Sequence, residues 1–168
     1  MKKIPLTQGQ FALVDDADFN WLSRHKWYAN WNGHTQSFYA ERNRKQMNTK
    51  WRSISMAREI LGLKFGDKRQ ADHINHDTLN NQRSNLRICS CAENLRNQRK
   101  SKNNSSGFRG VYWNKARNKW RSQISYNGKS IYLGYFMSLV EAAKCYDRAA
   151  IKHHREFANL NFPKNCNN

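Results

Sequence analysis

The sequence predicts an α+β protein built from two small units, and three observations support this class. A chain of 168 residues can bury one medium core or two modest ones. Three strand-like runs within residues 107–136 precede a helical pattern over residues 138–154, and together they make a small domain. Residues 71–98 are rich in asparagine and poor in apolar side chains, so packing of a helix or strand does not explain them.

The composition favours a nucleic-acid partner. The formal net charge is +18 and the pI is about 10.2, which points to a polyanion. Aromatic residues make up 12% of the chain, and a basic disordered tail would lack such rings. The sequence has no apolar run long enough to span a bilayer and no basic amphipathic helix with a clean apolar face, so we expect no membrane partner.

The cysteines and the amino-terminal residues indicate a cytoplasmic protein. The chain has a single C-x-C and no C-x-x-C pair, so we expect no structural zinc; its cysteines are Cys89, Cys91, Cys145 and Cys166. Lys2 and Lys3 resemble the start of a secretory signal, but Pro5 and nearby polar residues end that pattern at once.

The first half predicts short strands and turns with one helical turn over residues 11–43. An amphipathic helix follows over residues 53–63, with Ser53 or Ser55 near its cap and Gly62 near its end. We place a basic linker at residues 100–107, which separates domains at 1–99 and 108–163.

The second half carries the strongest turn and cap signals. Asn127 and Gly128 favour a tight hairpin between the last two strands. Ser138 and Glu141 have the spacing of a capping box at the start of the helix. One helix face suits close packing on a sheet; it carries Ala142, Cys145, Tyr146, Ala149 and Ala150.

The polar run in the middle contains a candidate metal and acid–base site. Asp72 and His73 end a predicted strand, where adjacent side chains point to opposite sides. A loop leads to a second strand over residues 84–88 and to a helix over residues 90–99 with Ser90 as its cap. If that helix packs across the hairpin, Asn94 faces Asp72, and this oxygen pair suits Mg²⁺.

The run DHINHDTLNNQRSNLRICSCAENLRN resembles the HNH motif, the ββα-metal site of phage- and intron-encoded homing endonucleases. The resemblance implies that His73 is the general base, that Asp72 and Asn94 bind the metal, and that Asn85 ties the loop together and orients the histidine. It implies Mg²⁺ or Mn²⁺ as the cofactor. The resemblance also implies a phage-infected or bacterial host cell. We expect His76 and Asp77 only to shape the turn and assign them no chemistry.

Residues 107–163 are similar to the DNA-binding domain of plant ethylene-response factors of the APETALA type, in "RGV", "KW", "YLGYF", "EAAKCYDRAA" and "NFP". The resemblance implies a three-stranded antiparallel sheet, packed on one helix, that reads the DNA major groove. Gln123 stands where the plant domains have Glu, so their target is not transferred. Matching contact positions are Arg109, Tyr112, Trp113, Arg117, Lys119, Arg121, Gln123, Ser125, Lys129 and Tyr132.

Charge adds further candidate DNA contacts, because no acidic residue lies between Glu93 and Glu141. These additional residues are Arg96, Arg99, Lys100, Lys102 and Lys115. Trp120, Leu133 and Phe136 are expected in the core instead.

We therefore expect a metal-dependent DNA endonuclease of the homing type, a hydrolase that leaves 5′-phosphate and 3′-OH ends on double-stranded DNA. The alternative is a sequence-specific DNA-binding regulator with an inactive HNH domain. RNA binding is a weaker third reading, since strands suit the narrow A-form groove poorly. Nicking versus double-strand cutting stays open, as does homing versus another phage role. We expect a monomer, with a dimer as the alternative.

Overall fold

The computed structural model describes residues 1–45, 50–97 and 104–163. Its contacts divide the chain into two compact units, Met1–Cys91 and a second unit that begins at Ala92. The described residues form four antiparallel sheets with short helices, so the α+β class is confirmed at that level. Among them, no helix is both long and apolar enough to cross a bilayer. The predicted contacts Arg99, Lys100 and Lys102 lie outside the described residues, as do Cys166 and residues 98–103 of the predicted helix and linker.

The first unit combines three small sheets. In one, β1 (Lys2–Pro5) pairs with β2 (Phe11–Val14), and α1 (Asp16–Leu22) follows. The second has the order β3-β4-β5, from β3 (Tyr28–Asn32), β4 (Ser37–Lys45) and β5 (Trp51–Ser55). The third pairs β6 (Gln70–His73) with β7 (Leu86–Cys89). The short helices α2 (Met56–Ile60) and η1 (Arg83–Asn85) complete the unit. Helix α3 (Cys91–Arg96) begins at the last residue of this unit and continues into the second.

The predicted helix over residues 53–63 is shorter in the structure, because β5 takes its first residues. Ser53 pairs with Asn43 and Ile54 with Arg42 across the β4–β5 ladder, so α2 begins only at Met56. Ser55 holds the N-cap position, and Gly62 follows the helix with φ +68. Of the two predicted cap residues, Ser53 and Ser55, the structure therefore has Ser55.

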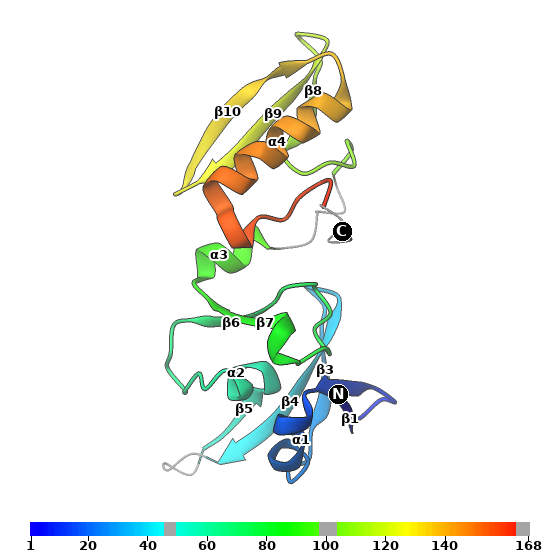
Figure 1. The fold of residues 1–168 in the computed structure, drawn as a ribbon, viewed down its shortest axis with the longest axis vertical. Helices are drawn as coiled ribbons and strands as arrows, with labels where there is room; N and C mark the ends of the chain where they lie inside the picture. Colours follow the sequence, from blue (N-terminus) through cyan, green and yellow to red (C-terminus); the bar gives the residue numbers. More distant parts are fainter. Residues whose placement is uncertain (46–49, 98–103, 164–168) are drawn as a thin grey trace. The chain divides into compact units, whose positions relative to one another are not determined.

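The core of the first unit explains the placement of α2. This helix contacts β4, β5 and β6 (Figure 1). Its Met56, Ala57 and Ile60 are buried together with Leu22 and Trp27. Burial of such side chains contributes roughly 1.5–3 kcal/mol each for the larger ones. The helix thereby supports the strand that carries Asp72 and His73.

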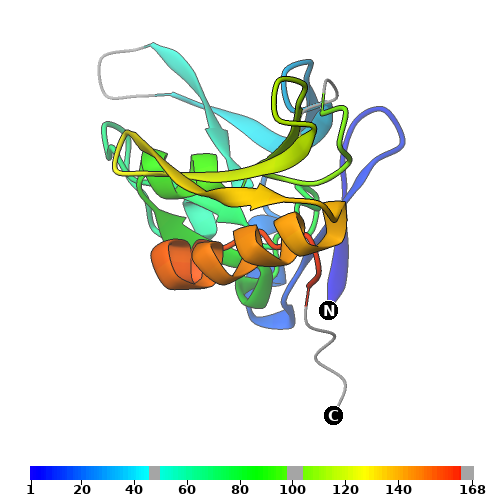
Figure 2. The same ribbon diagram turned by 90° about the horizontal axis from the view of Figure 1, so that it is seen from above.

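The second unit is a three-stranded sheet covered by one helix. The sheet order is β10-β9-β8, from β8 (Val111–Asn114), β9 (Lys119–Tyr126) and β10 (Lys129–Phe136). Helix α4 (Leu139–His154) contacts all three strands, lies along one face of the sheet (Figures 1 and 2), and is followed by η2 (Arg155–Phe157). This is the sheet-and-helix arrangement expected from the sequence.

The local signals of this unit are confirmed. Asn127 and Gly128 have φ values of 50° and 72° at the β9–β10 turn, as a tight hairpin requires. The Ser138 hydroxyl accepts a hydrogen bond from the Glu141 N–H at 3.4 Å. On α4, Ala142, Tyr146 and Ala150 are buried against the sheet.

The segments on either side of the sheet and helix are held to this unit by hydrogen bonds. Before it, Asn104 Nδ2 donates to Phe108 O at 2.8 Å and Ser106 Oγ donates to Val111 O at 2.6 Å. After it, the Asp147 carboxylate accepts from the backbone N–H of Asn161 and of Phe162, both at 2.8 Å. Asn104 and Ser106 belong to the segment predicted as a linker, and both are hydrogen-bonded to the second unit.

Candidate functional site

Asp72 and His73 occupy the carboxyl end of β6, next to a polar loop that returns to β7. The antiparallel register pairs Asp72 with Arg87 and His73 with Leu86. Asp72 is 5% exposed and His73 7% exposed, so neither is an ordinary surface side chain. Buried polar groups require partners, and the loop supplies several of them.

The loop is built from turns that its own polar side chains cap. Asn75 Oδ1 accepts from Asp77 N at 2.8 Å, and Asp77 Oδ1 accepts from Leu79 N at 3.1 Å. Asn80 Oδ1 accepts from Gln82 N at 3.3 Å. These are the turns that Asn and Asp side chains favour. His76 has φ +64 within this loop. Much of the asparagine content therefore shapes the backbone.

Asn85 joins the two ends of the loop. Its Oδ1 accepts from Asn75 N at 3.0 Å, and its Nδ2 donates to Asn80 O at 2.8 Å and to Asp77 O at 3.4 Å. The Asn85 carbonyl accepts from Ile74 N at 2.9 Å, directly after His73. The amide of Asn85 thus fixes the loop that follows the β6 strand.

The loop is also attached to the rest of the first unit. Leu13 N donates to Leu79 O, and Asn81 N donates to Leu13 O, each at 2.8 Å. Arg83 makes two contacts of 2.8 Å with the buried carboxylate of Asp18. This guanidinium lowers the pKa of Asp18, which keeps the carboxylate charged. Arg83 thus holds a structural carboxylate.

Asn81 holds the imidazole of His73, a role that the sequence did not reveal. His73 Nε2 lies 3.2 Å from Asn81 Oδ1, while Asn81 Nδ2 donates to Leu79 O at 3.2 Å. Since the amide nitrogen of Asn81 faces a carbonyl, its oxygen faces the ring, and His73 donates through Nε2. The lone pair of the neutral imidazole then resides on Nδ1. Tyr39 lies edge-on to the ring, with the centroids 6.3 Å apart.

Burial lowers the pKa of His73, and the Asn81 hydrogen bond and the charges of Asp72 and Asp77 oppose that shift. A lowered pKa favours the neutral imidazole near pH 7. A neutral, oriented imidazole beside a carboxylate can accept a proton.

Asp72 is paired with Arg87 on the neighbouring strand. Arg87 Nε and Nη2 lie 2.8 and 2.7 Å from Asp72 Oδ2. Asn94 lies on α3, in the stretch that the contacts assign to the second unit. Nothing within residues 1–45, 50–97 and 104–163 forms a group of three or more His, Cys, Asp or Glu side chains suited to a metal ion. A carboxylate and an amide oxygen still fit a hard cation, which takes its other ligands from water and phosphate.

The sheet of the second unit presents a cationic and aromatic face. Ser122 and Ile124 are 0% and 1% exposed, and strand alternation places Arg121 and Gln123 on the opposite face. Arg121 Cζ lies 5.6 Å from the ring centroid of Tyr112 and 5.5 Å from that of Tyr132. These distances are in the cation–π range, so the two rings hold the guanidinium in place.

Neighbouring polar contacts order the same face. The Tyr112 hydroxyl donates to Gln123 Oε1, and burial raises the pKa of Tyr112, so this hydroxyl stays protonated. Arg117 Cζ lies 5.0 Å from the Tyr135 ring centroid. Four of the predicted contact residues, Tyr112, Arg121, Gln123 and Tyr132, therefore form one connected group.

The other predicted contacts lie outside this connected group. Trp113 stands beside Trp120 with ring centroids 4.9 Å apart, and alternation puts both on the side opposite Tyr112. The turn and strand-end residues Lys115, Arg117, Lys119 and Lys129 are exposed.

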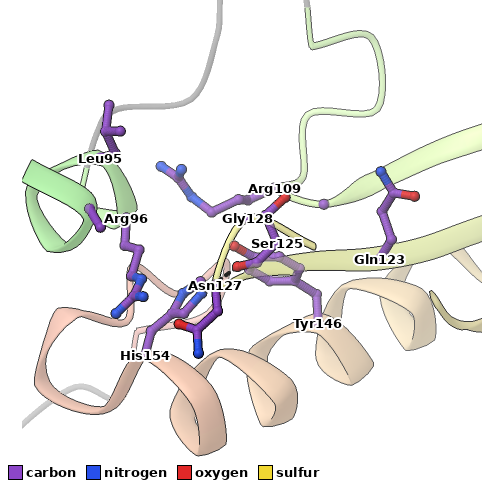
Figure 3. A pocket seen from close by; sticks show the side chains of 11 residues that line it. Leu95, Arg96, Arg109, Gln123, Ser125, Asn127, Gly128, Tyr146 and His154 are labelled. Carbon is purple, nitrogen blue, oxygen red and sulfur yellow. Dashed lines mark hydrogen bonds between the residues drawn. The ribbon is translucent and has the colours of Figure 1, made fainter. Parts of the chain in front are cut away.

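Arg96, Arg109 and Ser125 line a pocket of about 440 Å³ with Tyr146 and His154 (Figure 3). His154 Nε2 lies 2.9 Å from Ser125 O. Burial is the main cause that lowers the pKa of His154 and that of Arg109. Arg96 Cζ is 5.6 Å from the Tyr126 ring centroid.

Comparisons with known proteins find similarity to both parts of the chain. Residues 106–156 match the AP2 domain. The chain is 40% identical over 58 residues to Protein 3.8 of Escherichia phage T7, and 42% identical over 65 residues to APETALA2-like protein 2 of Oryza sativa subsp. indica. These matches cover 34% and 39% of this chain, and 48% and 15% of those proteins, so each relative extends well beyond the shared segment.

A more distant relative matches most of the chain. It is the Uncharacterized HNH endonuclease L560 of Acanthamoeba polyphaga mimivirus. The identity is 27% over 151 residues, which cover 90% of this chain and 74% of that protein. A match of this length includes the Asp72–His73 region and most of the AP2 segment.

Proposed function

We propose that the chain is a metal-dependent DNA endonuclease of the HNH type, with a second unit that binds duplex DNA. The observation that carries the proposal is the buried Asp72–His73 pair, whose imidazole is oriented by Asn81 and whose loop is tied by Asn85. Similarity over 90% of the chain to a protein named as an HNH endonuclease supports it.

In this proposal His73 accepts the proton of the water that attacks phosphorus. The new bond joins the water oxygen to phosphorus and the bond to the 3′ oxygen breaks. The 3′ oxygen takes a proton from solvent, so the ends are a 5′-phosphate and a 3′-OH. Asp72 and Asn94 would hold Mg²⁺ or Mn²⁺, and this cation supplies charge stabilisation at the leaving oxygen. Arg87 fixes the direction of the Asp72 carboxylate.

The duplex would lie on the sheet face that carries Arg121. Its guanidinium, held between Tyr112 and Tyr132, can contact a base edge or a phosphate. The match to the AP2 domain supports DNA as the partner. Exposed Lys115, Lys119 and Lys129 add sequence-independent attraction to phosphates.

One observation favours a second candidate, a DNA-binding regulator. Asp72 is buried and already paired with Arg87, an arrangement that also suits a purely structural ion pair. In that case the first unit would only support the DNA-binding unit.

Plasmid cleavage separates the two candidates. Supercoiled plasmid carrying a library of sites is incubated with the chain in Mg²⁺ or in EDTA. We expect nicked or linear product in Mg²⁺ only, loss of this product in His73→Ala, and full activity in the control His34→Ala, an exposed histidine near the β3–β4 turn. DNA binding that is equal in all three proteins, without cleavage, would support the regulator instead.

A further inference from the structure

The first unit contains a basic groove that the proposed chemistry does not use. It lies between the β4–β5 hairpin and the segment that follows α2, and its volume is about 1020 Å³. We propose that this groove binds single-stranded nucleic acid. Its lining includes five basic side chains and one aromatic ring, those of Arg44, Lys45, Arg52, Arg58, Lys64 and Phe65.

The hairpin places two like charges opposite each other. Arg44 pairs directly with Arg52 in the β4–β5 register. Like charges at directly opposite positions destabilise a strand pair. In the described parts of the chain, no ion pair involves Arg44, Lys45, Arg52 or Lys64. A polyanion in the groove would remove this repulsion.

The remaining charged residues of the groove are engaged within the protein. Glu59, the acidic residue that lines it, accepts from Arg42 Nε at 2.8 Å. Arg58 donates to three backbone carbonyls, those of Lys64, Asp67 and Arg69, at 3.1, 3.2 and 2.7 Å. Arg58 therefore fixes the segment that carries Lys64 and Phe65, and the groove keeps a net positive charge.

Phe65 is the feature that selects single strands. Its side chain is 66% exposed, and Arg52 Cζ lies 4.3 Å from its ring centroid. An exposed ring beside cations is a platform for a nucleic-acid base. Bases within a duplex are already stacked on their neighbours, so only an unpaired base can use this ring. A concave groove also suits a flexible strand better than a stiff duplex.

This inference goes beyond the proposed cleavage and does not require it. Helix α2 packs against β6, the strand that ends in Asp72 and His73, so the groove belongs to the same unit as the candidate site. Binding is measured in EDTA, where a metal-dependent cleavage reaction would not occur. Failure of the nuclease proposal would thus leave the groove testable.

The test is fluorescence anisotropy of the full chain with a labelled oligothymidine of about 12 nucleotides and with a duplex of similar length. We expect Phe65→Ala to weaken binding of the oligothymidine about tenfold, which corresponds to about 1.4 kcal/mol of lost stacking. Duplex binding should stay within about twofold. Lys68→Ala, which removes an exposed cation outside the groove, is the matched control. Arg121→Ala should weaken duplex binding more than binding of the oligothymidine.

Two results would overturn the proposal. One is an equal effect of Phe65→Ala and Lys68→Ala on the oligothymidine. The other comes from the unaltered chain, which is photocrosslinked to an oligonucleotide containing 5-iodouracil and digested with trypsin. We expect the crosslink on the peptide that begins at Phe65, and crosslinks confined to the sheet of the second unit would refute the groove even if a variant failed to fold.

Discussion

His73 Nε2 and Asn81 Oδ1 lie 3.2 Å apart in the buried part of the polar loop. The same Asn81 donates from its backbone N–H to Leu13 O, so one residue connects the imidazole to strand β2. The position of the candidate base is therefore set by the core of the first unit through Asn81.

Replacement of Asn81 should affect both stability and cleavage. Asn81→Ala removes a buried partner of His73 and should lower the free energy of unfolding by about 1–3 kcal/mol. We expect cleavage to fall by about tenfold to a hundredfold, with unchanged duplex affinity, because His73 loses its orientation. Single-turnover cleavage, urea unfolding and anisotropy measure the three quantities. Asn80→Ala, which loses one turn hydrogen bond, should retain most of the activity.

Gly110 is the position in the second unit where a side chain cannot fit. A Cβ there would lie 2.1 Å from Tyr146 Cδ2 and 2.5 Å from Gln123 O, at φ +71. We expect Gly110→Ala to destabilise the unit by about 2–6 kcal/mol, as overpacking and strain add. Gly128 has a similar φ of +72, but no atom lies within 4 Å of an added Cβ. Gly128→Ala should therefore lower the free energy of unfolding by only about 1–2 kcal/mol. Equal shifts in melting temperature for the two variants would contradict the role of the Tyr146 contact.

His154 should make stability depend on pH. Burial lowers its folded-state pKa below the ordinary 6.5, so the unfolded chain binds more protons just below that pH. The contribution of His154 to the free energy of unfolding is present above pH 6.5. It is lost as the pH falls through 6.5 toward the folded-state pKa. Unfolding at pH 7.5 and 5.5 should show a smaller loss in His154→Gln than in the unaltered chain. An identical loss in both proteins would assign the dependence to other groups.

Arg121 should contribute to the salt dependence of duplex binding if it contacts a phosphate. Arg121→Ala should weaken duplex binding and reduce the slope of log K against log salt concentration by about 0.9. Arg148→Ala removes an exposed charge on α4, which covers the other face of the sheet, and serves as the control. A reduction in slope of equal size in Arg148→Ala would indicate only general attraction.

The fold was predictable where the signals are local. The Asn127–Gly128 turn and the Ser138 cap depend on residues close in sequence, and the structure has both. The helix predicted from residue 53 was too long because pairing between β4 and β5 is a long-range effect that overrides an amphipathic pattern. Periodicity alone does not show such a pairing.

The candidate site was predictable only in part for the same reason. The positions of Asp72, His73 and Asn85 can be read from motif spacing, whereas their roles remain predictions. Asn81 could not be distinguished from its neighbouring asparagines, because its partners Leu13 and His73 are known only once the chain folds. The opposition of Arg44 and Arg52 likewise depends on strand register.

The most direct measurement of the central claim follows the oxygen atom of the attacking water. Plasmid is cleaved in Mg²⁺ in heavy-oxygen water, and the new ends are analysed by mass spectrometry. The endonuclease proposal predicts one heavy oxygen in each new 5′-phosphate and a 3′-OH on the other side of each cut. It predicts no labelled product from His73→Ala. Unlabelled ends, 3′-phosphate ends, or equal labelling by His73→Ala would contradict it.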